Sequence, residues 1–361
     1  SFCESLLGRF PLEAGIAPHF EVMDERDAAE GQAEARLRVL NRARTDGDAA
    51  VSAALAGVTG HINEAEFGAL MAALSADRGR IRRLIKTHDG VEKLVEATYA
   101  RLGVPRDATP QREIQAASQD GTFDADGLRR AAAAMLRGSK TDQDRGAIIA
   151  AWLAANTADR TAAMDAYLAT YFTTTGTVRK SLINKAAKAI EPAADDVLGA
   201  EAERLDMVQQ RIRAAVTAAA TTALLHLADA LLAEYEGYKR EIGRLDYDDL
   251  ILLARALLER DGGASWVLFK LDGGIDHILI DEAQDTNPDQ WAVVRALAEE
   301  FFAGLGANEA TRTVFAVGDT KQSIYSFQRA APEEFDAMRA YFRARAKTAE
   351  QGWDDVDLDM S

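Results

Sequence analysis

The sequence predicts a mainly α-helical protein with a partial α/β part, and three observations lead to this prediction. Up to about residue 240, apolar residues recur at the spacing of amphipathic helices. Two short β-prone runs then follow, at 277–280 and 313–317. Between these runs, Pro288 to Phe302 has helical periodicity. Strand, helix and strand, with polar residues where each strand ends, is the pattern of a parallel α/β sheet.

The segment before residue 240 is expected to form one all-helical domain. It shows no strand-like alternation and no repeat of fixed period. The clearest amphipathic helices are expected at Phe67–Leu74, Leu94–Leu102, Ala147–Leu168 and Val197–Tyr238. Loops are expected at Pro105 and Pro110, at Gly138-Ser139 and at residues 173–176.

The α/β part is expected to be incomplete, because two strands are too few for a parallel sheet. The chain begins with Ser1 and not with Met, so we expect it to be part of a longer protein. The missing strands would then lie ahead of Ser1 or elsewhere in that protein.

Composition restricts the possible functions. The 361 residues carry a net charge of −16, which argues against a simple DNA-coating protein. A groove with local positive charge remains possible, because screening confines fields to about 10 Å at ordinary salt. Cys3 is the single cysteine, so no internal disulfide can form, which fits a reducing cytoplasm. No apolar run long enough to span a membrane and no secretory signal are expected.

The strongest local signal is residues 278–286, which read Ile-Leu-Ile-Asp-Glu-Ala-Gln-Asp-Thr. An apolar strand ending in adjacent Asp281 and Glu282 is what a Walker B site requires. The first carboxylate can hold Mg²⁺, and the second can orient and deprotonate a water. The competing interpretation is that both acids cap the following helix, where acids are favoured in any case. The run continues with Gln284, Asp285 and Thr286, and this favours the Walker B interpretation, because a cap needs only one polar residue.

A second signal lies at residues 317–327, which read Val-Gly-Asp-Thr-Lys-Gln-Ser-Ile-Tyr-Ser-Phe. Gly318 permits a sharp turn at the strand end. Asp319 and Gln322 would share the edge of the sheet where the acids lie. Tyr325 and Phe327 could stack on bases if exposed, and ordinary core packing is the alternative.

These two segments, in this order and with this gap, resemble motifs II and III of UvrD/RecB-like superfamily 1 DNA helicases. Residues 1–3 resemble the end of that family's motif Ib, and residues 245–250 resemble its Asp-Phe-x-Asp-Leu segment. Residues 1–15 are most similar to the AddA type, a helicase-nuclease component of double-strand break repair. The specific resemblance covers residues 1–15 and 245–330, and the helical stretch between them matches in position and character only.

The resemblance implies a domain organisation and a function. Residues 1–15 and 241–361 would be parts of a RecA-like P-loop NTPase motor domain (1A), and residues 16–240 would be an all-helical 1B-like insertion. The longer protein would be an ATP-dependent 3′-to-5′ DNA helicase that uses ATP and Mg²⁺. It would act on single- and double-stranded DNA ends in repair and recombination, with a second subunit of AddB type, in the cytoplasm and away from membranes.

The resemblance also assigns roles to individual residues. Asp281 would coordinate Mg²⁺ and Glu282 would be the catalytic base. Gln284 and Gln322 would sense the terminal phosphate of the nucleotide. The residues that it places on or near DNA are Ser1, Phe2, Tyr325 and Phe327. Asp246 and Asp249 would be structural and would orient the return of the chain into the motor domain.

The chain departs from the family pattern in two ways. Gln328 and Arg329 stand where the family has a different tripeptide after the aromatic residue. More seriously, no Gly-x-x-x-x-Gly-Lys-Ser/Thr phosphate-binding loop is present, and 138–141 (Gly-Ser-Lys-Thr) is interpreted as a loop between helices. We therefore expect the isolated chain to be inactive as an ATPase. The alternative function is a non-catalytic DNA- or partner-binding helical module.

Two basic stretches are weaker candidates for DNA contacts. A run from Arg78 to Lys86 would ordinarily be a solvated helix face. Residues 171–188 combine two aromatics, threonines and cations, among them Arg179 and Lys180. Such a stretch suits phosphate contacts and stacking, and a plain linking loop is the alternative. The five histidines show no metal-ligand spacing.

Overall fold

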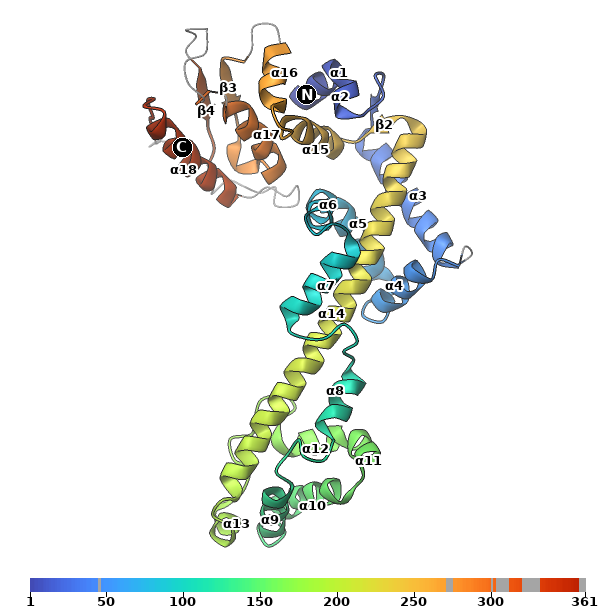
Figure 1. Ribbon diagram of the computed structural model, residues 1–361, viewed down its shortest axis with the longest axis vertical. Coiled ribbons are helices and arrows are strands. Elements are labelled where there is room, and N and C mark those ends of the chain that lie inside the picture. The colour runs from blue at the N-terminus through green and yellow to red at the C-terminus, as the bar shows by residue number, and fades with distance from the viewer. Residues whose placement is uncertain (45–46, 271–274, 300, 303–311, 320–331, 357–361) are drawn as a thin grey trace. The chain divides into compact units, whose positions relative to one another are not determined.

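The computed structural model describes residues 1–44, 47–270, 275–299, 301–302, 312–319 and 332–356. The described chain forms two compact units, whose elements are labelled in Figure 1. The α/β unit comprises Ser1–Ala35 and Tyr235–Ser361, and the helical unit comprises Arg36–Glu234. The predicted domain boundaries, after residues 15 and 240, refer to the domains of a helicase family and stay predictions.

The α/β unit contains short helices around two small sheets. Its elements are α1 (Phe2–Arg9), α2 (Pro11–Ala14), β1 (Glu21–Val22), β2 (Arg244–Leu245), α15 (Tyr247–Leu258), α16 (Gly263–Lys270), β3 (His277–Ile280), the 3₁₀ turn η1 (Ala283–Asp285), α17 (Pro288–Glu299), β4 (Thr313–Ala316) and α18 (Pro332–Thr348). Two helices, α3 (Glu25–Arg44) and α14 (Ala194–Ile242), contribute residues to both units.

The parallel pairing predicted for the two β-prone runs is confirmed. Strands β3 and β4 pair in parallel, with Ile280 opposite Ala316, and α17 lies between them in sequence. Two strands, β1 and β2, were not predicted. Residues Glu21–Val22 form β1, which pairs in parallel with β2, so the segment expected to be wholly helical contains a two-residue strand.

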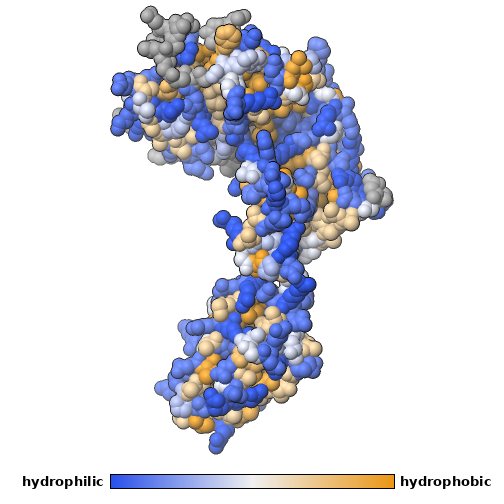
Figure 2. Space-filling model, in the orientation of Figure 1, coloured by the Kyte–Doolittle hydropathy of each residue, from blue (hydrophilic) through white to orange (hydrophobic). Residues whose placement is uncertain are grey.

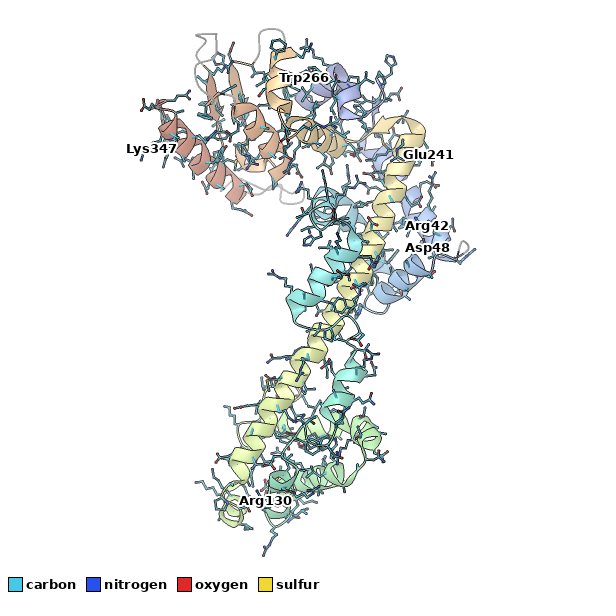
Figure 3. The ribbon with its side chains drawn as sticks, in the orientation of Figure 1. Arg42, Asp48, Arg130, Glu241, Trp266 and Lys347 are labelled. Atoms are coloured by element: carbon cyan, nitrogen blue, oxygen red, sulfur yellow. The ribbon has the colours of Figure 1, made fainter. Side chains whose placement is uncertain are left out.

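The core of the α/β unit joins the first residues of the chain to the helices that precede and follow β3. Leu6 and Phe10 are buried in one cluster with residues of α15, α16 and α17. The ring of Phe10 lies 5.1 Å from that of Trp266, which Figure 3 labels. A second cluster packs Ala283, directly after the paired acids, with Trp291 of α17 and Phe342 of α18. Burial of these apolar side chains is the main force that holds the strand ends in place.

The helical unit is built around the part of α14 that belongs to it. Its other elements are α4 (Ala49–Thr59), α5 (Glu64–Ala76), α6 (Arg78–Thr87), α7 (Val91–Leu102), α8 (Pro110–Ala117), α9 (Ala125–Met135), α10 (Lys140–Ala154), α11 (Thr157–Ala162), α12 (Met164–Tyr171) and α13 (Lys185–Ile190). One buried cluster joins α9, α10, α12 and α14, and another joins α7 to α14.

The single helix expected at Ala147–Leu168 is wrong, because three helices occupy this range. The Asn156 side chain accepts from the N–H of Asp159 and starts α11, and a further break at Ala163 separates α11 from α12. Asparagine competes for backbone hydrogen bonds in this way at helix starts. The loop predicted at Gly138-Ser139 is confirmed, since Ser139 caps α10 through a capping box.

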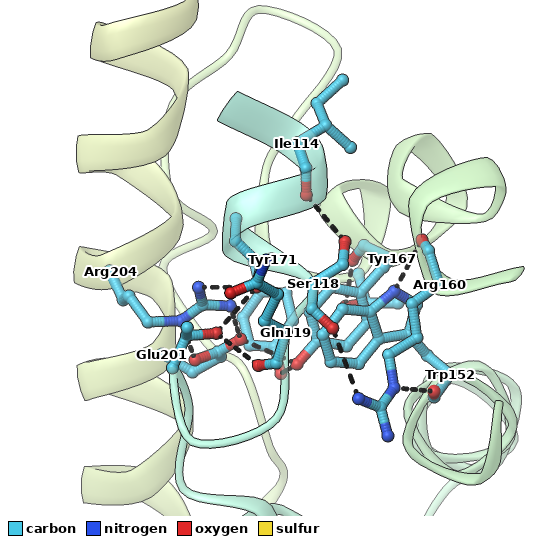
Figure 4. A network of polar contacts seen from close by, with 12 residues as sticks. Ile114, Ser118, Gln119, Trp152, Arg160, Tyr167, Tyr171, Glu201 and Arg204 are labelled. Carbon is cyan, nitrogen blue, oxygen red and sulfur yellow. Dashed lines mark hydrogen bonds and ion pairs between the residues drawn. The ribbon is translucent and has the colours of Figure 1, made fainter. Parts of the chain in front are cut away.

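A buried polar network connects α12 to α14 within the helical unit (Figure 4). The carboxylate of Glu201 accepts from the Tyr167 hydroxyl at 2.9 Å and from two nitrogens of Arg204 at 2.7 Å. Tyr171 donates to the Tyr167 oxygen at 3.3 Å, and Tyr167 stacks on Trp152 with ring centroids 4.0 Å apart. Burial raises the pKa of both tyrosines well above the ordinary value. Bidentate pairing is the arrangement that makes a buried carboxylate tolerable.

The expectation that no apolar run is long enough to span a membrane does not hold for helix α14. By length and composition alone it could cross a membrane, since one stretch reaches a mean hydropathy of 1.5. The core helix of a water-soluble protein passes the same test, and 44% of that stretch is buried inside the structure. Ala215 and Ala218, for example, pack against α7. On the face shown in Figure 2, apolar residues of the helical unit are scattered among hydrophilic ones.

Candidate functional site

The two predicted acids lie where β3 ends, beside the end of β4. Asp281 and Glu282 follow the last residue of β3 and are exposed. The pairing continues past both strands, because the N–H of Val317 donates to the Ile280 carbonyl at 2.9 Å and the N–H of Ala283 donates to the Val317 carbonyl at 2.9 Å. The carboxyl ends of two parallel strands are therefore brought together, which is the edge where α/β proteins bind ligands.

The competing interpretation, that these acids cap the following helix, does not fit the geometry. Helix α17 begins at Pro288, and its cap is formed by Asn287 and Gln290, whose side chains each accept from the other residue's N–H at 2.9 Å. The short η1 turn follows Glu282, but no backbone N–H of this turn is capped by the Glu282 side chain. Neither acid is needed for capping, so both carboxylates remain exposed at the sheet edge.

The backbone at Glu282 adopts a left-handed conformation, with φ 49° and ψ 46°. For a residue with a β-carbon this conformation costs roughly 1–2 kcal/mol. The turn folds the chain sharply from β3 into η1, and the Glu282 N–H donates to Oδ1 of Asp281 at 3.0 Å. Strain of this kind is concentrated at functional sites, where the surrounding structure enforces it.

The side chain of Gln284 links the paired acids to the end of β4. Its Nε2 donates to Oε2 of Glu282 at 2.7 Å, and its Oε1 accepts from the N–H of Asp319 at 3.0 Å. Gln284 is 2% exposed, so its own side-chain atoms are shielded from bulk water. In this conformation both polar atoms of the side chain are engaged inside the chain, and a direct contact with a phosphate would require the link to open.

Gly318 makes this link possible because a side chain would not fit there. A β-carbon at Gly318 would lie 2.4 Å from Oε1 of Gln284 and 3.1 Å from the nitrogen of Ala283. The close approach of the two strand ends therefore requires glycine, a reason for this residue that the sequence analysis did not give.

The donor set at this edge suits Mg²⁺. Carboxylate oxygens of Asp281 and Glu282 are the hard ligands that this ion prefers. In the described residues no cluster of three or more acidic, histidine or cysteine side chains could hold a metal by itself. Mg²⁺ is commonly bound through one or two carboxylates together with nucleotide phosphates and waters, so two acids are sufficient.

The other predicted site residues are distributed over both units. Gln322, Tyr325 and Phe327 lie outside the described residues. Ser1 caps α1 by accepting from the N–H of Glu4 at 3.3 Å, and Phe2, with 46% exposure, is the first residue of α1.

Arg179 and Lys180 belong to the helical unit and follow the loop after α12. Arg179 donates to the Ala169 carbonyl in the last turn of that helix, and Lys180 is exposed.

The structural role predicted for Asp246 and Asp249 is confirmed. The two residues form the capping box that starts α15. Lys239, only 4% exposed, bonds to both carboxylates, and the Tyr235 hydroxyl donates to Asp246 at 2.8 Å. Sequence reasoning missed Lys239, because a lysine in the last turn of a long helix ordinarily reaches solvent.

The basic run at the start of α6 is not simply a solvated face. Arg78 is 3% exposed, and its Nη1 donates to the Ser75 carbonyl. Arg82 donates to the carbonyl of Leu232 in α14 at 3.2 Å. At these two positions the guanidinium groups contribute to packing inside the helical unit, which a count of charges along the sequence does not reveal.

A family model described as the UvrD/REP helicase N-terminal domain matches residues 1–343. The chain belongs to this family. The UvrD/REP assignment confirms the resemblance stated from motifs II and III and supports a RecA-like part in the α/β unit.

Individual relatives of this UvrD/REP chain match a smaller part of it than the family model does. It is 36% identical over 112 residues to an ATP-dependent helicase/nuclease protein (AddA) of Exiguobacterium sibiricum, a stretch that is 31% of this chain and 9% of that protein. The protein of the same name from Listeria monocytogenes serovar 1/2a is 37% identical over 112 residues, 31% of this chain and 8% of its own length. A probable DNA helicase II homolog of Mycoplasma pneumoniae is 30% identical over 116 residues, 32% of this chain and 14% of its own length.

Proposed function

We propose that this chain is part of the ATP-hydrolysing motor of a 3′-to-5′ DNA helicase or translocase that acts in double-strand break repair and recombination. The observation that carries the proposal is the exposed Asp281–Glu282 pair at the end of β3, tied through Gln284 to the end of the neighbouring parallel strand. ATP and Mg²⁺ are the proposed cofactors. Membership of the UvrD/REP family supports the proposal.

The two acids have different proposed roles. Asp281 holds Mg²⁺, which neutralises charge on the transferred phosphoryl group when it is bound. Glu282 orients the attacking water and accepts its proton. The left-handed turn at Glu282 and the hydrogen bond from Gln284 hold the carboxylate in one position before the reaction begins. Such positioning supplies most of the catalysis in phosphoryl transfer.

Gln284 acts in this proposal as the positioning residue between motifs II and III. A displacement of the segment around Asp319 would pull on Oε1 of Gln284, and Nε2 would then shift the Glu282 carboxylate. Gln322 remains the proposed sensor of the terminal phosphate. Tyr325 and Phe327, a few residues further on, remain proposed DNA contacts, together with Ser1 and Phe2.

The type of the longer protein, its partner, its substrate and its location are proposed from the names of the relatives. A helicase/nuclease name suggests a longer protein of AddA type with an AddB-type partner, DNA ends as substrate and a cytoplasmic location. The helical unit would correspond to domain 1B. Each relative extends well beyond the matched stretch, and the sheet described here has only two paired strands, so the full activity is assigned to the longer protein.

The sequence contains no Gly-x-x-x-x-Gly-Lys-Ser/Thr loop to hold the β- and γ-phosphates. The isolated chain should therefore not hydrolyse ATP, although it carries the two acids. The alternative, a non-catalytic DNA- or partner-binding helical module, applies to the chain in isolation.

ATPase and strand-separation assays on the isolated chain and on the longer protein test the proposal. The longer protein should show DNA-stimulated ATPase activity and should unwind duplexes with a 3′ single-stranded tail in preference to those with a 5′ tail. The isolated chain should show neither activity. An EDTA-sensitive ATPase of the isolated chain, or a longer protein without DNA-stimulated ATPase, would contradict the proposal.

A further inference from the structure

Two arginines of the helical unit are anchored next to each other by backbone carbonyls. Arg145 of α10 donates through Nη1 to the carbonyl of Ser181 at 3.3 Å. Arg179, two residues before Ser181, donates through Nη2 to the carbonyl of Ala169 at 3.1 Å. Ala169 lies in the last turn of α12, where a cation is favoured by the helix dipole. Both guanidinium groups therefore have defined anchors, and each keeps further N–H donors.

The loop that carries Arg179 is held by its own hydrogen bonds. Phe172 and Val178 form an antiparallel bridge, and the N–H of Arg179 donates to the Tyr171 carbonyl at 2.9 Å. Gly176, with φ 77°, supplies the left-handed residue that closes the turn. The position of Arg179 is thus set by the fold of the loop as well as by its side chain.

In the part of the chain that the structure describes, neither arginine is within ion-pair distance of a carboxylate, and the same holds for the exposed Lys180. Two other cations nearby in sequence have such partners: Lys140 pairs with Asp144 at 2.6 Å, and Lys188 pairs with Asp195 at 2.7 Å.

The local sequence explains why no carboxylate lies within ion-pair distance of Arg179 and Lys180 in the described residues. No acid occurs between Asp165 and Glu191, in a chain with 58 acidic residues in total. Asp142 is the acid whose charge acts on Arg145, but it is 3% exposed and is occupied in the cap of α10.

The two like charges affect each other. Burial, and then the charge of Arg179, lower the pKa of Arg145 below its usual value. Arginine side chains are not deprotonated in proteins, so this lowering leaves the charge of Arg145 in place at neutral pH. Adjacent cations that share no counter-ion are stabilised when an anion binds between them. Guanidinium groups with free donors suit phosphate oxygens in particular.

We propose that Arg145 and Arg179, with Lys180 beside them, form a binding site for phosphodiester groups of a nucleic acid backbone. The proposal rests on the proposed function for its choice of nucleic acid. It assigns a DNA contact to Arg145, which no sequence pattern marks. Lys188, the last cation of the stretch 171–188, is not included because it is paired with Asp195. Contacts to phosphates carry no sequence information, so the site should position DNA and not select a sequence.

Salt titrations of DNA binding by the 361-residue chain test the proposal, with fluorescein-labelled single-stranded and duplex DNA and fluorescence anisotropy as the readout. Each lost phosphate contact lowers the slope of log affinity against log salt by about 0.7 for single strands and about 0.9 for duplex. The Arg145→Gln/Arg179→Gln variant should therefore lose about 1.4 of the slope on single strands or about 1.8 on duplex. The strand type whose measured loss reaches the value expected for two contacts is the form of DNA that the site binds.

Two control variants separate charge from folding. Arg112→Gln/Arg129→Gln removes the same charge from two exposed arginines of the helical unit that are paired with Asp107 and Asp126, and it should keep the wild-type slope. Arg145→Lys/Arg179→Lys keeps the charges without the guanidinium anchors and should keep most of the slope.

The proposal is overturned if the wild-type chain does not bind DNA, if the Gln variant keeps the wild-type slope, or if the Lys variant loses as much slope as the Gln variant. None of these results bears on ATP hydrolysis, because the assay contains no nucleotide. Failure of the site is therefore distinguishable from failure of the proposed helicase activity.

Discussion

Gln284 donates a 2.7 Å hydrogen bond from Nε2 to Oε2 of Glu282, and the same side chain accepts the N–H of Asp319. The proposed base is thus held by a buried residue that also contacts the end of the neighbouring strand. A hydrogen bond to a carboxylate fixes the direction in which it points. Changes in motif III can therefore reach Glu282 through two hydrogen bonds.

Replacing Gln284 by Glu should impair turnover in the longer protein. The new carboxylate would face the Glu282 carboxylate and would repel it, so the pKa of the pair should rise. We expect turnover at neutral pH to fall by about 10², the scale of a misplaced catalytic group. The acid limb of the pH–rate profile should also move to higher pH. Steady-state ATPase rates between pH 6 and about 9 measure both effects.

Gln290→Glu is the matched control for this variant. Gln290 belongs to the cap of α17, where glutamate is equally suitable, and it does not contact Glu282. Its pH–rate profile should match that of the wild type. Equal profiles for Gln284→Glu and Gln290→Glu would show that the link to Glu282 has no part in turnover.

Gly318→Ala should destabilise the α/β unit. The added β-carbon would overlap Oε1 of Gln284, so the strand ends must separate. Overpacking of this kind costs about 1–3 kcal/mol. Urea unfolding of the chain measures the change, with Gly352→Ala as control, because a β-carbon at Gly352 meets no atom within 4 Å. Equal stabilities of the two variants would contradict the close approach described here.

Lys239→Met should strongly lower the free energy of unfolding. It leaves the buried carboxylates of Asp246 and Asp249 without their cation, and breaking a buried pair costs about 3–5 kcal/mol. Lys93→Met is the control, because Lys93 pairs with Asp89 at the surface and should matter little. Thermal unfolding compares the two, and similar midpoints would show that the Lys239 network contributes no more than a surface pair.

The helical unit should lose stability in alkali. Burial raises the pKa of Tyr167 and Tyr171 above the ordinary value of 10.0, so the folded state keeps both protons where the unfolded state releases them. This contribution is fully present below pH 10 and is lost progressively as the pH rises further. Circular dichroism during urea unfolding, at pH values from about 8 to 11, measures the loss.

The double variant Tyr167→Phe/Tyr171→Phe should flatten this alkaline decline. Tyr247→Phe, which changes a 59% exposed tyrosine, should leave it unchanged. An equally steep decline in the double variant would assign the alkaline sensitivity to other groups.

Local sequence patterns predicted the elements whose determinants are contiguous. Strands β3 and β4 and helix α17 follow from apolar runs and their spacing, and the acids after β3 were placed at the sheet edge for the same reason. The pairing of β1 with β2 was missed, because each strand has two residues and Glu21 lies 223 positions from Arg244. Such a pairing is decided by tertiary contacts and leaves no periodic signal.

Site details that depend on side-chain geometry were also beyond the sequence. Gln284 was assigned to phosphate sensing from the motif, and its two internal hydrogen bonds appear only once the strand ends are placed together. The grouping of Arg145 with Arg179 likewise requires α10 to pack beside the loop after α12. Both relationships join segments that are separate along the chain.

The central claim is that Glu282 is the base of an ATP-hydrolysing motor, and one substitution tests it most directly. Glu282→Gln in the longer protein keeps the shape of the side chain and the partner for Gln284 but removes the proton acceptor. DNA-stimulated ATP turnover should fall by about 10² or more, while ATP binding measured by equilibrium titration stays within a few-fold of wild type. Glu259→Gln, at an exposed ion pair with Arg255, should leave both quantities unchanged. Turnover of Glu282→Gln within a few-fold of wild type would contradict the assignment of the base.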